Sequence, residues 1–169
     1  MKSIVKLGVM IGIALASIVA GVVFFWPAPA TGPEPIVYGR DTCASCRMHM
    51  SRPGFAGEMR DPDGTLTKYD DIGCLIRAIL AAHRETPEAW VEDHAGGGFV
   101  PLLSAKLVRA DGASTPMESG LVAFGDEAAA RIYAEAHAAR VMTFEDVLRD
   151  STLLALLTAR PPSGARRAP

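Results

Sequence analysis

The densest group of side chains able to do chemistry is the segment "DTCASCRMHM", residues 41–50. It places a Cys-x-x-Cys pair, Cys43 and Cys46, directly before Met48, His49 and Met50. Thiolate, thioether and imidazole groups are metal ligands, and two cysteines at this spacing can also form a disulfide. The segment therefore predicts a metal site, a redox dithiol or a structural disulfide.

Two of these chemistries fit the sequence poorly. A structural zinc site needs four nitrogen or sulfur ligands, and the chain has only one further cysteine, Cys74, while its other histidines are far apart. A thioredoxin-like dithiol lies at the start of a helix that follows a parallel strand, where the helix dipole lowers the thiol pKa. Here Pro53 and Gly54 follow within a few residues and interrupt any such helix.

A structural disulfide remains open, either between Cys43 and Cys46 or between Cys46 and Cys74. An oxidising compartment outside the cytoplasm permits such a bond. Cys74 taken alone lies beside Leu75 on the apolar face of a predicted helix, which favours a buried, inert thiol separate from the loop.

A soft-metal site is the interpretation that uses most of the segment. Thiolate and thioether sulfurs favour Cu(I), which accepts two or three ligands. Cys46 and Met48 are two residues apart, so an extended chain turns both side chains to one face, and His49 or Met50 can complete the set. We expect Met48 and Met50 to be exposed, and the site to be accessible to solvent, since a partner has to reach the metal.

Met117 is a candidate distant ligand. It lies in the turn-rich stretch "STPMESG", where a core methionine is unusual. If the two halves of the chain pack together, Met117 can reach the first group of sulfurs. Its alternative role is to cover a hydrophobic edge.

Length, composition and charge limit the class of protein. The chain has 169 residues, with 17 lysines and arginines against 19 aspartates and glutamates, and three cysteines. This length predicts one domain or two small ones, and the scarcity of cysteine excludes a disulfide scaffold. The mildly acidic composition provides no basic footprint, so we expect no nucleic-acid partner.

The N-terminal segment, residues 1–26, predicts export and membrane tethering. Lys2 and Lys6 precede residues 7–26, an apolar stretch without charged residues that is long enough to span a bilayer as a helix. The competing interpretation is a cleaved signal peptide with an Ala-x-Ala-like site at Ala28 and Ala30. We expect an uncleaved anchor, and in both cases the positive-inside rule places the rest of the chain on the periplasmic side of the inner membrane.

A proline-rich linker, residues 27–35, and a disordered tail, residues 160–169, bound the folded part. Between them, residues 36–159 predict two similar ββαβ units, about 36–100 and 101–159. In the first unit, Pro-Asp-Gly at 62–64 separates two extended runs, Asp70 and Asp71 cap a helix, and "AWVED" is a return strand.

The second unit repeats this order. Strands are predicted at 105–109 and 121–124, a helix at 126–138, and a strand at 141–144, with a final helix over 143–159. The pattern predicts an α+β fold in which helices pack on antiparallel sheets, preceded by an N-terminal membrane helix.

Four segments, in order, resemble the nitrous oxide reductase accessory protein family, NosL: "DTCASCRMHM", "YDDIGCLIRAI", "WVEDH" and "STPMESGLVAF" with the helix that follows it. The resemblance covers about residues 38–148. It implies a membrane-tethered periplasmic protein, not an enzyme, that binds Cu(I) and passes it on during assembly of the copper–sulfur cluster of nitrous oxide reductase. The implied partners are that reductase and a periplasmic maturation protein with its ABC transporter.

Carried over by position, the family's Cys-x-x-Cys-x-Met motif implies Cys43, Cys46 and Met48 as ligands, and its Pro-Met turn implies Met117. We expect Cys46, Met48 and Met117 first, with Cys43 or His49 completing the set. Two features depart from the family. The chain has no lipid-attachment cysteine near residues 17–30, and a glutamate follows Met117 where the family usually has glycine.

Two other functions stay open at this point. One is a periplasmic thiol-disulfide protein that keeps a copper site reduced. The other is an anchored interaction module with a structural disulfide.

Overall fold

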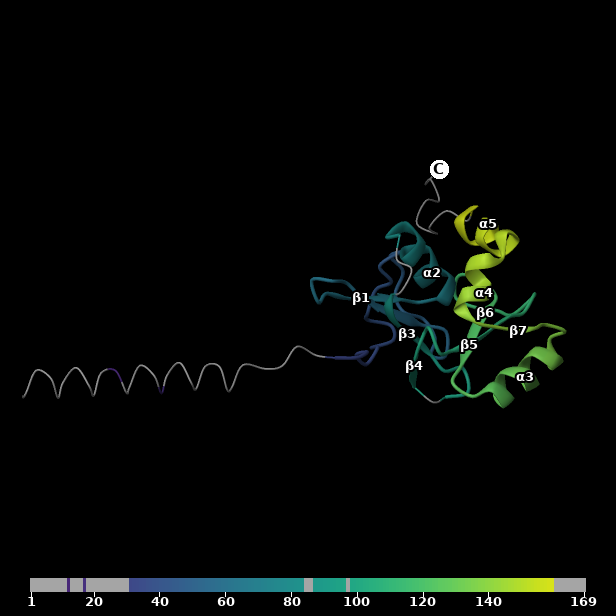
Figure 1. The fold of residues 1–169 in the computed structure, drawn as a ribbon, viewed down its shortest axis with the longest axis horizontal. Helices are drawn as coiled ribbons and strands as arrows, with labels where there is room; N and C mark the ends of the chain where they lie inside the picture. The colour runs from purple at the N-terminus through teal and green to yellow at the C-terminus, as the bar shows by residue number, and fades with distance from the viewer. Residues whose placement is uncertain (1–11, 13–16, 18–30, 84–86, 97, 160–169) are drawn as a thin grey trace, which may run out of the picture. The chain divides into compact units, whose positions relative to one another are not determined.

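The computed structural model describes residues 12, 17, 31–83, 87–96 and 98–159 (Figure 1). The chain separates into two compact units, residues 1–31 and 32–169, and the fold given below is that of the second. The predicted membrane segment lies outside the described residues except at Gly12 and Ser17, and the predicted tail lies outside them entirely. Within the described part, no helix has both the length and the apolar character needed to cross a bilayer.

The first half of the folded part is a four-stranded antiparallel sheet with one helix packed on it. Its elements are β1 (Gly57–Arg60), β2 (Leu66–Tyr69), α2 (Ile72–Ala81), β3 (Glu88–Glu92) and β4 (Phe99–Pro101). The predicted Pro-Asp-Gly turn joins β1 to β2, and the sheet order is β2-β1-β3-β4. β4 therefore adds one edge strand to the predicted ββαβ order.

The second half repeats the arrangement with three strands. Its elements are β5 (Lys106–Arg109), β6 (Leu121–Phe124), α3 (Glu127–Ala136) and β7 (Val141–Met142). The order β6-β5-β7 again places the first strand of the unit between the second and the third, and all pairings are antiparallel. The predicted α+β class with two antiparallel sheets is confirmed.

The single helix predicted over 143–159 is wrong, because the segment forms two helices, α4 (Phe144–Arg149) and α5 (Ser151–Ala159). Thr143 begins α4 through a capping box with Asp146, which also ends the preceding strand at Met142. Asp150 then leaves the helical conformation (φ −82°, ψ 91°), and its carboxylate accepts a hydrogen bond from the Leu153 N–H at 3.0 Å. This cap starts α5 in a new direction.

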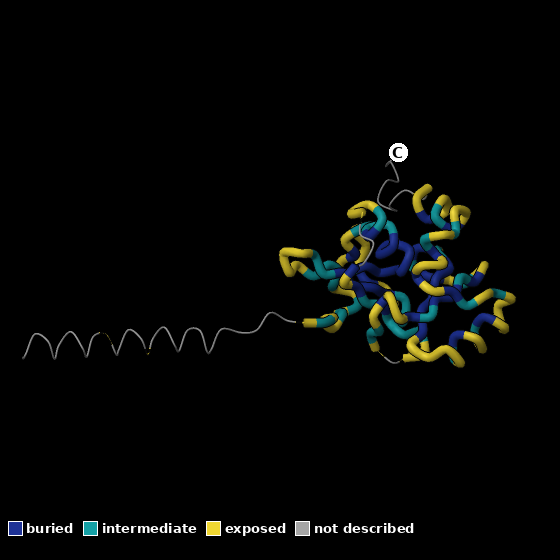
Figure 2. Tube along the Cα trace, viewed as in Figure 1, coloured by how far each residue is buried: buried dark blue, intermediate teal, exposed yellow. Residues whose placement is uncertain are grey.

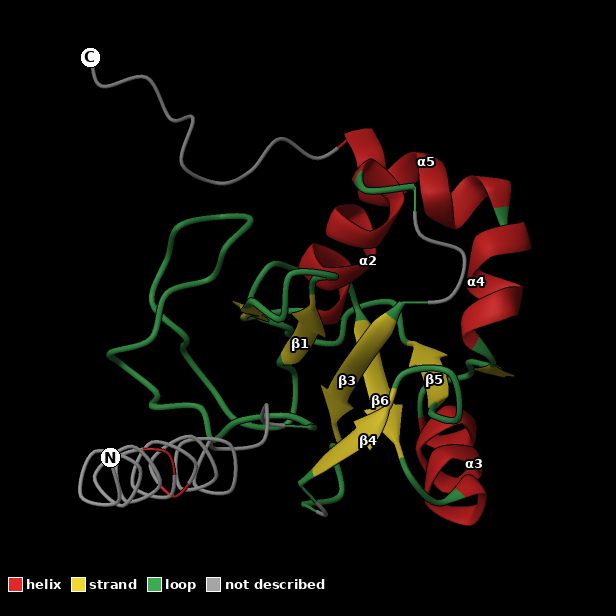
Figure 3. Ribbon diagram, turned by 60° about the vertical axis from the view of Figure 1, so that its left-hand side comes forward, coloured by secondary structure: helices red, strands yellow, loops and turns green. Residues whose placement is uncertain are grey.

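One hydrophobic core joins the two halves (Figure 2). The apolar face of α2 packs on β1 and β2 and reaches β6, and α5 closes over α2, while α3 covers the second sheet with a smaller core of its own (Figure 3). The sheets meet where Asp93 forms a parallel bridge with Ala123. The three cysteines belong to this shared core, so the fold buries them together.

Candidate metal centre

Residues 41–50 form a tight hairpin at the edge of the first sheet. Thr42 pairs with His49 as an antiparallel bridge, and the Cys43 N–H donates to the Met48 carbonyl oxygen at 2.9 Å. Arg47 turns the chain with a φ of 63°, and its N–H donates to the Cys43 carbonyl oxygen at 3.0 Å. Because side chains alternate along paired arms, the hairpin has an inner and an outer face.

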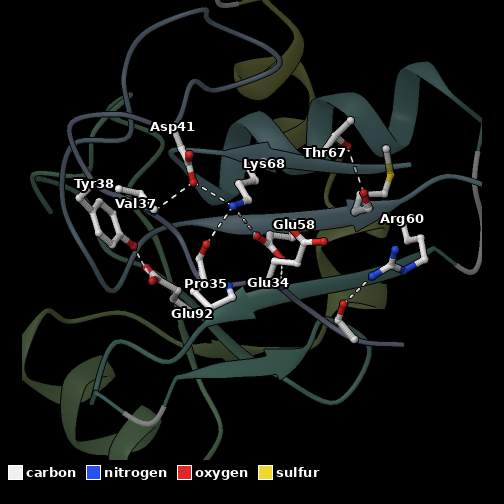
Figure 4. A network of polar contacts seen from close by, with 12 residues as sticks. Glu34, Pro35, Val37, Tyr38, Asp41, Glu58, Arg60, Thr67, Lys68 and Glu92 are labelled. Carbon is white, nitrogen blue, oxygen red and sulfur yellow. Dashed lines mark hydrogen bonds and ion pairs between the residues drawn. The ribbon is translucent and has the colours of Figure 1, made fainter. Parts of the chain in front are cut away.

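Lys68 of β2 holds the hairpin, and the segment before it, against the sheet (Figure 4). Its carbonyl oxygen accepts from the Ala44 N–H at 2.8 Å, and its ammonium group lies 2.8 Å from the Asp41 carboxylate and 2.9 Å from the Pro35 carbonyl oxygen. The fully buried Glu58 of β1 lies 4.0 Å from the same ammonium group. Burial raises the pKa of the Glu58 carboxyl, and the Lys68 charge opposes that shift.

The hairpin brings Cys43 and Cys46 together with Cys74 of α2. The three sulfur atoms lie within 4.8 Å of one another, and the residues are 0 %, 2 % and 0 % exposed. Metal–sulfur bonds of about 2.3 Å in a trigonal arrangement separate the sulfurs by about 4 Å, so the cluster needs only a small adjustment to hold an ion. All three cysteines are free thiols, and within the described residues no other group of three or more Cys, His, Asp or Glu lies at ligand distance.

One thiol of this three-cysteine cluster is acidic, and the other two retain their protons. The hydrogen bond from the Cys74 thiol lowers the pKa of Cys43 to about 5 against the effect of burial, with help from the N–H groups of Cys46 and Asp70. The same bond, together with burial, raises the pKa of Cys74, and burial is the main cause that raises the pKa of Cys46. Near neutral pH the cluster therefore holds one thiolate and two thiols.

The thiolate can be tested by acid titration. We expect the ultraviolet absorbance of a single thiolate in the reduced protein to persist until the pH falls to about 5. Since the folded pKa of Cys43 lies below its unfolded value, its ionisation stabilises the fold fully above the ordinary thiol pKa, and this contribution is lost as the pH falls toward 5. Cys74→Ala should raise the midpoint by more than about one pH unit, and Cys46→Ala should raise it less. A wild-type midpoint in the ordinary thiol range would contradict the arrangement.

Arg77 adds a positive charge on the next turn of α2. Its guanidinium donates to the Cys74 sulfur at 3.1 Å. A metal ion of low charge held by several thiolates would leave the cluster with a net negative charge, which a neighbouring guanidinium offsets. Neither Arg77 nor Cys74 is among the metal-site residues predicted from the sequence.

The ligands predicted from the hairpin lie in three different surroundings. Cys43 and Cys46 are buried, so the expectation that these sulfurs face solvent is wrong. Met50 is also fully buried, contrary to its predicted exposure, because it lies on the inner face of the hairpin. Met48 is 47 % exposed next to the cluster, whereas His49 is exposed on the outer face, out of phase with the sulfurs.

The Met117 backbone is hydrogen-bonded to Asp71 at the start of α2, the helix that carries Cys74. Met117 also belongs to the same hydrophobic core as the three cysteines. Asp71, the N-cap of α2, accepts hydrogen bonds from the Met117 N–H at 2.9 Å, the Thr115 hydroxyl at 2.8 Å and the Gly73 N–H at 2.7 Å. A Cβ atom on Gly73 would lie 2.6 Å from the Cβ of Ser119, so only glycine allows the loop to approach this closely. The predicted packing of the two halves at Met117 is thus present.

Comparisons with known proteins identify a family and a similar fold. The family model NosL matches residues 36–152. None of the curated proteins matches the chain. A solved structure, the crystal structure of the copper chaperone NosL from Shewanella denitrificans, matches with a TM-score of 0.62 and 17 % identity, over 69 % of this chain and 96 % of that one. At this identity the structural match concerns the fold.

Proposed function

Because the chain belongs to the NosL family, whose members are copper chaperones and not enzymes, we propose that it binds Cu(I) outside the cytoplasm and delivers it for assembly of the copper centre of nitrous oxide reductase. The observation that carries the proposal is the three-cysteine cluster of Cys43, Cys46 and Cys74. Three sulfurs without a nitrogen or oxygen ligand in the group suit a soft, monovalent ion.

The partners and the location are part of the same proposal. The partners are nitrous oxide reductase and its periplasmic maturation protein with an ABC transporter. Residues 7–26 tether the chain to the periplasmic side of the inner membrane, with the two preceding lysines on the cytoplasmic side. A chain that stays in the membrane fraction after a high-salt wash supports the tether, and a soluble product beginning near Thr31 contradicts it.

The predicted ligands divide between holding copper and exchanging it. Cys43 and Cys46 hold the ion with Cys74 while the hairpin is closed. Met48, exposed and two residues beyond Cys46, is the first sulfur that a partner meets. Met117 is a candidate ligand from the second half of the chain, and the exposed His49 is a candidate ligand at the surface.

Burial of the cluster is compatible with delivery. Cys43 lines a surface hollow of about 360 Å³ together with Arg47 and Lys68, so one residue of the cluster lies next to the surface. The bond from the Ala44 N–H to the Lys68 carbonyl oxygen and the Lys68–Asp41 ion pair hold the hairpin on β2, so delivery requires a local opening that breaks these contacts. A partner sulfur then replaces one ligand at a time, and each released thiolate of Cys46 or Cys74 takes up a proton.

The test is a titration of the reduced full-length chain in non-ionic detergent with Cu(I) against a competing chelator. We expect one Cu(I) per chain with a dissociation constant below about 10⁻¹² M, and release of about two protons, because one thiolate and two thiols become three thiolates. Zn(II) should not displace the copper. Weak binding, or binding without proton release, contradicts the proposal.

The lowered pKa of Cys43 favours one alternative, a thiol-disulfide protein that keeps a copper site reduced. Turnover of a disulfide substrate by a chain that has no copper affinity would establish that function instead.

A further inference from the structure

We propose that the outer face of the hairpin is a docking surface for an acidic protein surface that surrounds a copper-exchanging sulfur site. This basic face consists of Arg40, Arg47, His49 and Arg52, all exposed. The inference deepens the proposed function by naming the chemistry of the partner, and it rests on that function.

Backbone geometry separates the basic face from the sulfurs. Thr42 and His49 pair and both are exposed, whereas their neighbours Cys43 and Met50 are buried. Arg40 lies in the turn that precedes the hairpin, and its side chain is exposed. Arg47 occupies the turn directly after Cys46. Exposed arginines thus lie in and beside the loop whose thiols are buried.

The charges of this face are available to a partner. Asp41 is the one acidic residue between positions 37 and 52, and its carboxylate is bonded to the Lys68 ammonium group and to the Val37 N–H at 2.9 Å. Among the described residues, no carboxylate forms an ion pair with Arg40 or Arg47.

Arg52 keeps its charge exposed while its position is held. Its guanidinium lies 5.0 Å from the centre of the Phe55 ring and donates to the Ser114 carbonyl oxygen. A cation–π contact and a neutral acceptor position the group and leave its positive charge without a negative counterpart.

The sign of this face is opposite to that of the chain as a whole, which has a net charge of −2. A local field of one sign steers a partner of the opposite sign and raises the association rate more than the equilibrium affinity. The exposed Met48 lies next to the same face, so a partner drawn to the arginines arrives where copper can be exchanged. A lipid surface would cover Met48 and prevent exchange, and an acidic protein is therefore the occupant that fits.

The experiment measures the rate of copper transfer from the Cu(I)-loaded full-length chain, in non-ionic detergent, to two synthetic peptides. Both peptides carry one Cys-x-x-Cys pair, flanked by glutamates in the first and by glutamines in the second. Arg40→Gln/Arg47→Gln should slow transfer to the glutamate peptide by about 5- to 10-fold at low salt and leave transfer to the glutamine peptide unchanged. Arg131→Gln/Arg149→Gln removes the same charge from α3 and α4 and should change neither rate.

Each other outcome overturns the proposal. Equal slowing with both peptides means that the arginines position the hairpin and do not dock a partner. Equal rates for wild type and the Arg40/Arg47 variant mean that the face does not steer. Repeating the transfer in phosphatidylcholine nanodiscs, with and without phosphatidylglycerol, tests the lipid surface: a block by the anionic lipid that the variant relieves assigns the face to the membrane. Equilibrium copper affinity, measured in parallel, reports separately on the proposed function.

Discussion

Cys46→Ser is expected to weaken Cu(I) binding by more than about 100-fold. Loss of a group that merely supports a ligand typically costs 10- to 100-fold in metal affinity, so about 100-fold is a lower bound for a ligand itself. Cys46 is the residue that belongs both to the three-cysteine cluster and to the Cys-x-Met pair of the hairpin. The prediction therefore holds whichever of these two ligand sets the ion occupies.

The matched control for this variant is Met50→Leu. Met50 is fully buried in the same hairpin, and leucine conserves its volume, so the change tests packing without removing a proposed ligand. Affinity should remain within about 3-fold of wild type. The measurement is competition against a Cu(I) chelator at fixed pH, and a Cys46→Ser chain that binds copper as tightly as Met50→Leu would refute the assignment.

Two further variants separate the ligand sets. If copper occupies the closed cluster, Cys74→Ala should weaken binding by more than about 10-fold, whereas Met48→Ala should leave the affinity near that of wild type and slow transfer to an acceptor. The reverse pattern would assign the ion to Cys46, Met48 and Met117. The competition assay and a transfer assay on the same preparations distinguish these results.

Asp71→Ala is expected to lower the free energy of unfolding by about 3–5 kcal/mol. The carboxylate is fully buried and accepts three hydrogen bonds, from the Thr115 hydroxyl and from the N–H groups of Met117 and Gly73. Alanine would leave these buried donors without their acceptor, and each unsatisfied group costs about 1–3 kcal/mol. The variant should also release the Met117 loop from α2, with faster amide hydrogen exchange at residues 115–119.

The chain contains its own control for this effect. Asp126 occupies the same place in the second unit, at the start of α3, but it is exposed and accepts one N–H, from Ala129 at 2.9 Å. Asp126→Ala should cost about 1 kcal/mol, the usual value of an exposed N-cap. Urea denaturation of both variants gives the comparison. Equal losses would mean that Asp71 acts only as a helix cap and does not dock the second half of the chain.

The order of elements could be predicted because its determinants are local. The Pro-Asp-Gly turn, the caps at Asp71 and Asp126, and the helical spacing of apolar residues each act within a few positions along the chain. The error at 143–159 arose at Asp150, which lies between Arg149 and Ser151 and whose carboxylate accepts from the Leu153 N–H. This side chain ends one helix and caps the next, and the apolar spacing on either side of it does not reveal the break.

For the site, the sequence alone determined the chemistry: soft sulfur ligands concentrated in one ten-residue segment, with a methionine from the second half of the chain as a further candidate. Only the tertiary structure decided which sulfurs meet. Cys74 joins Cys43 and Cys46 because the hairpin is bonded to β2 through Lys68 and α2 follows β2 directly, so residues remote in sequence become neighbours. The tertiary structure also decided which residues of the hairpin are buried. The sheet on which a short hairpin rests, and not the composition of the hairpin, determines which of its two faces turns inward.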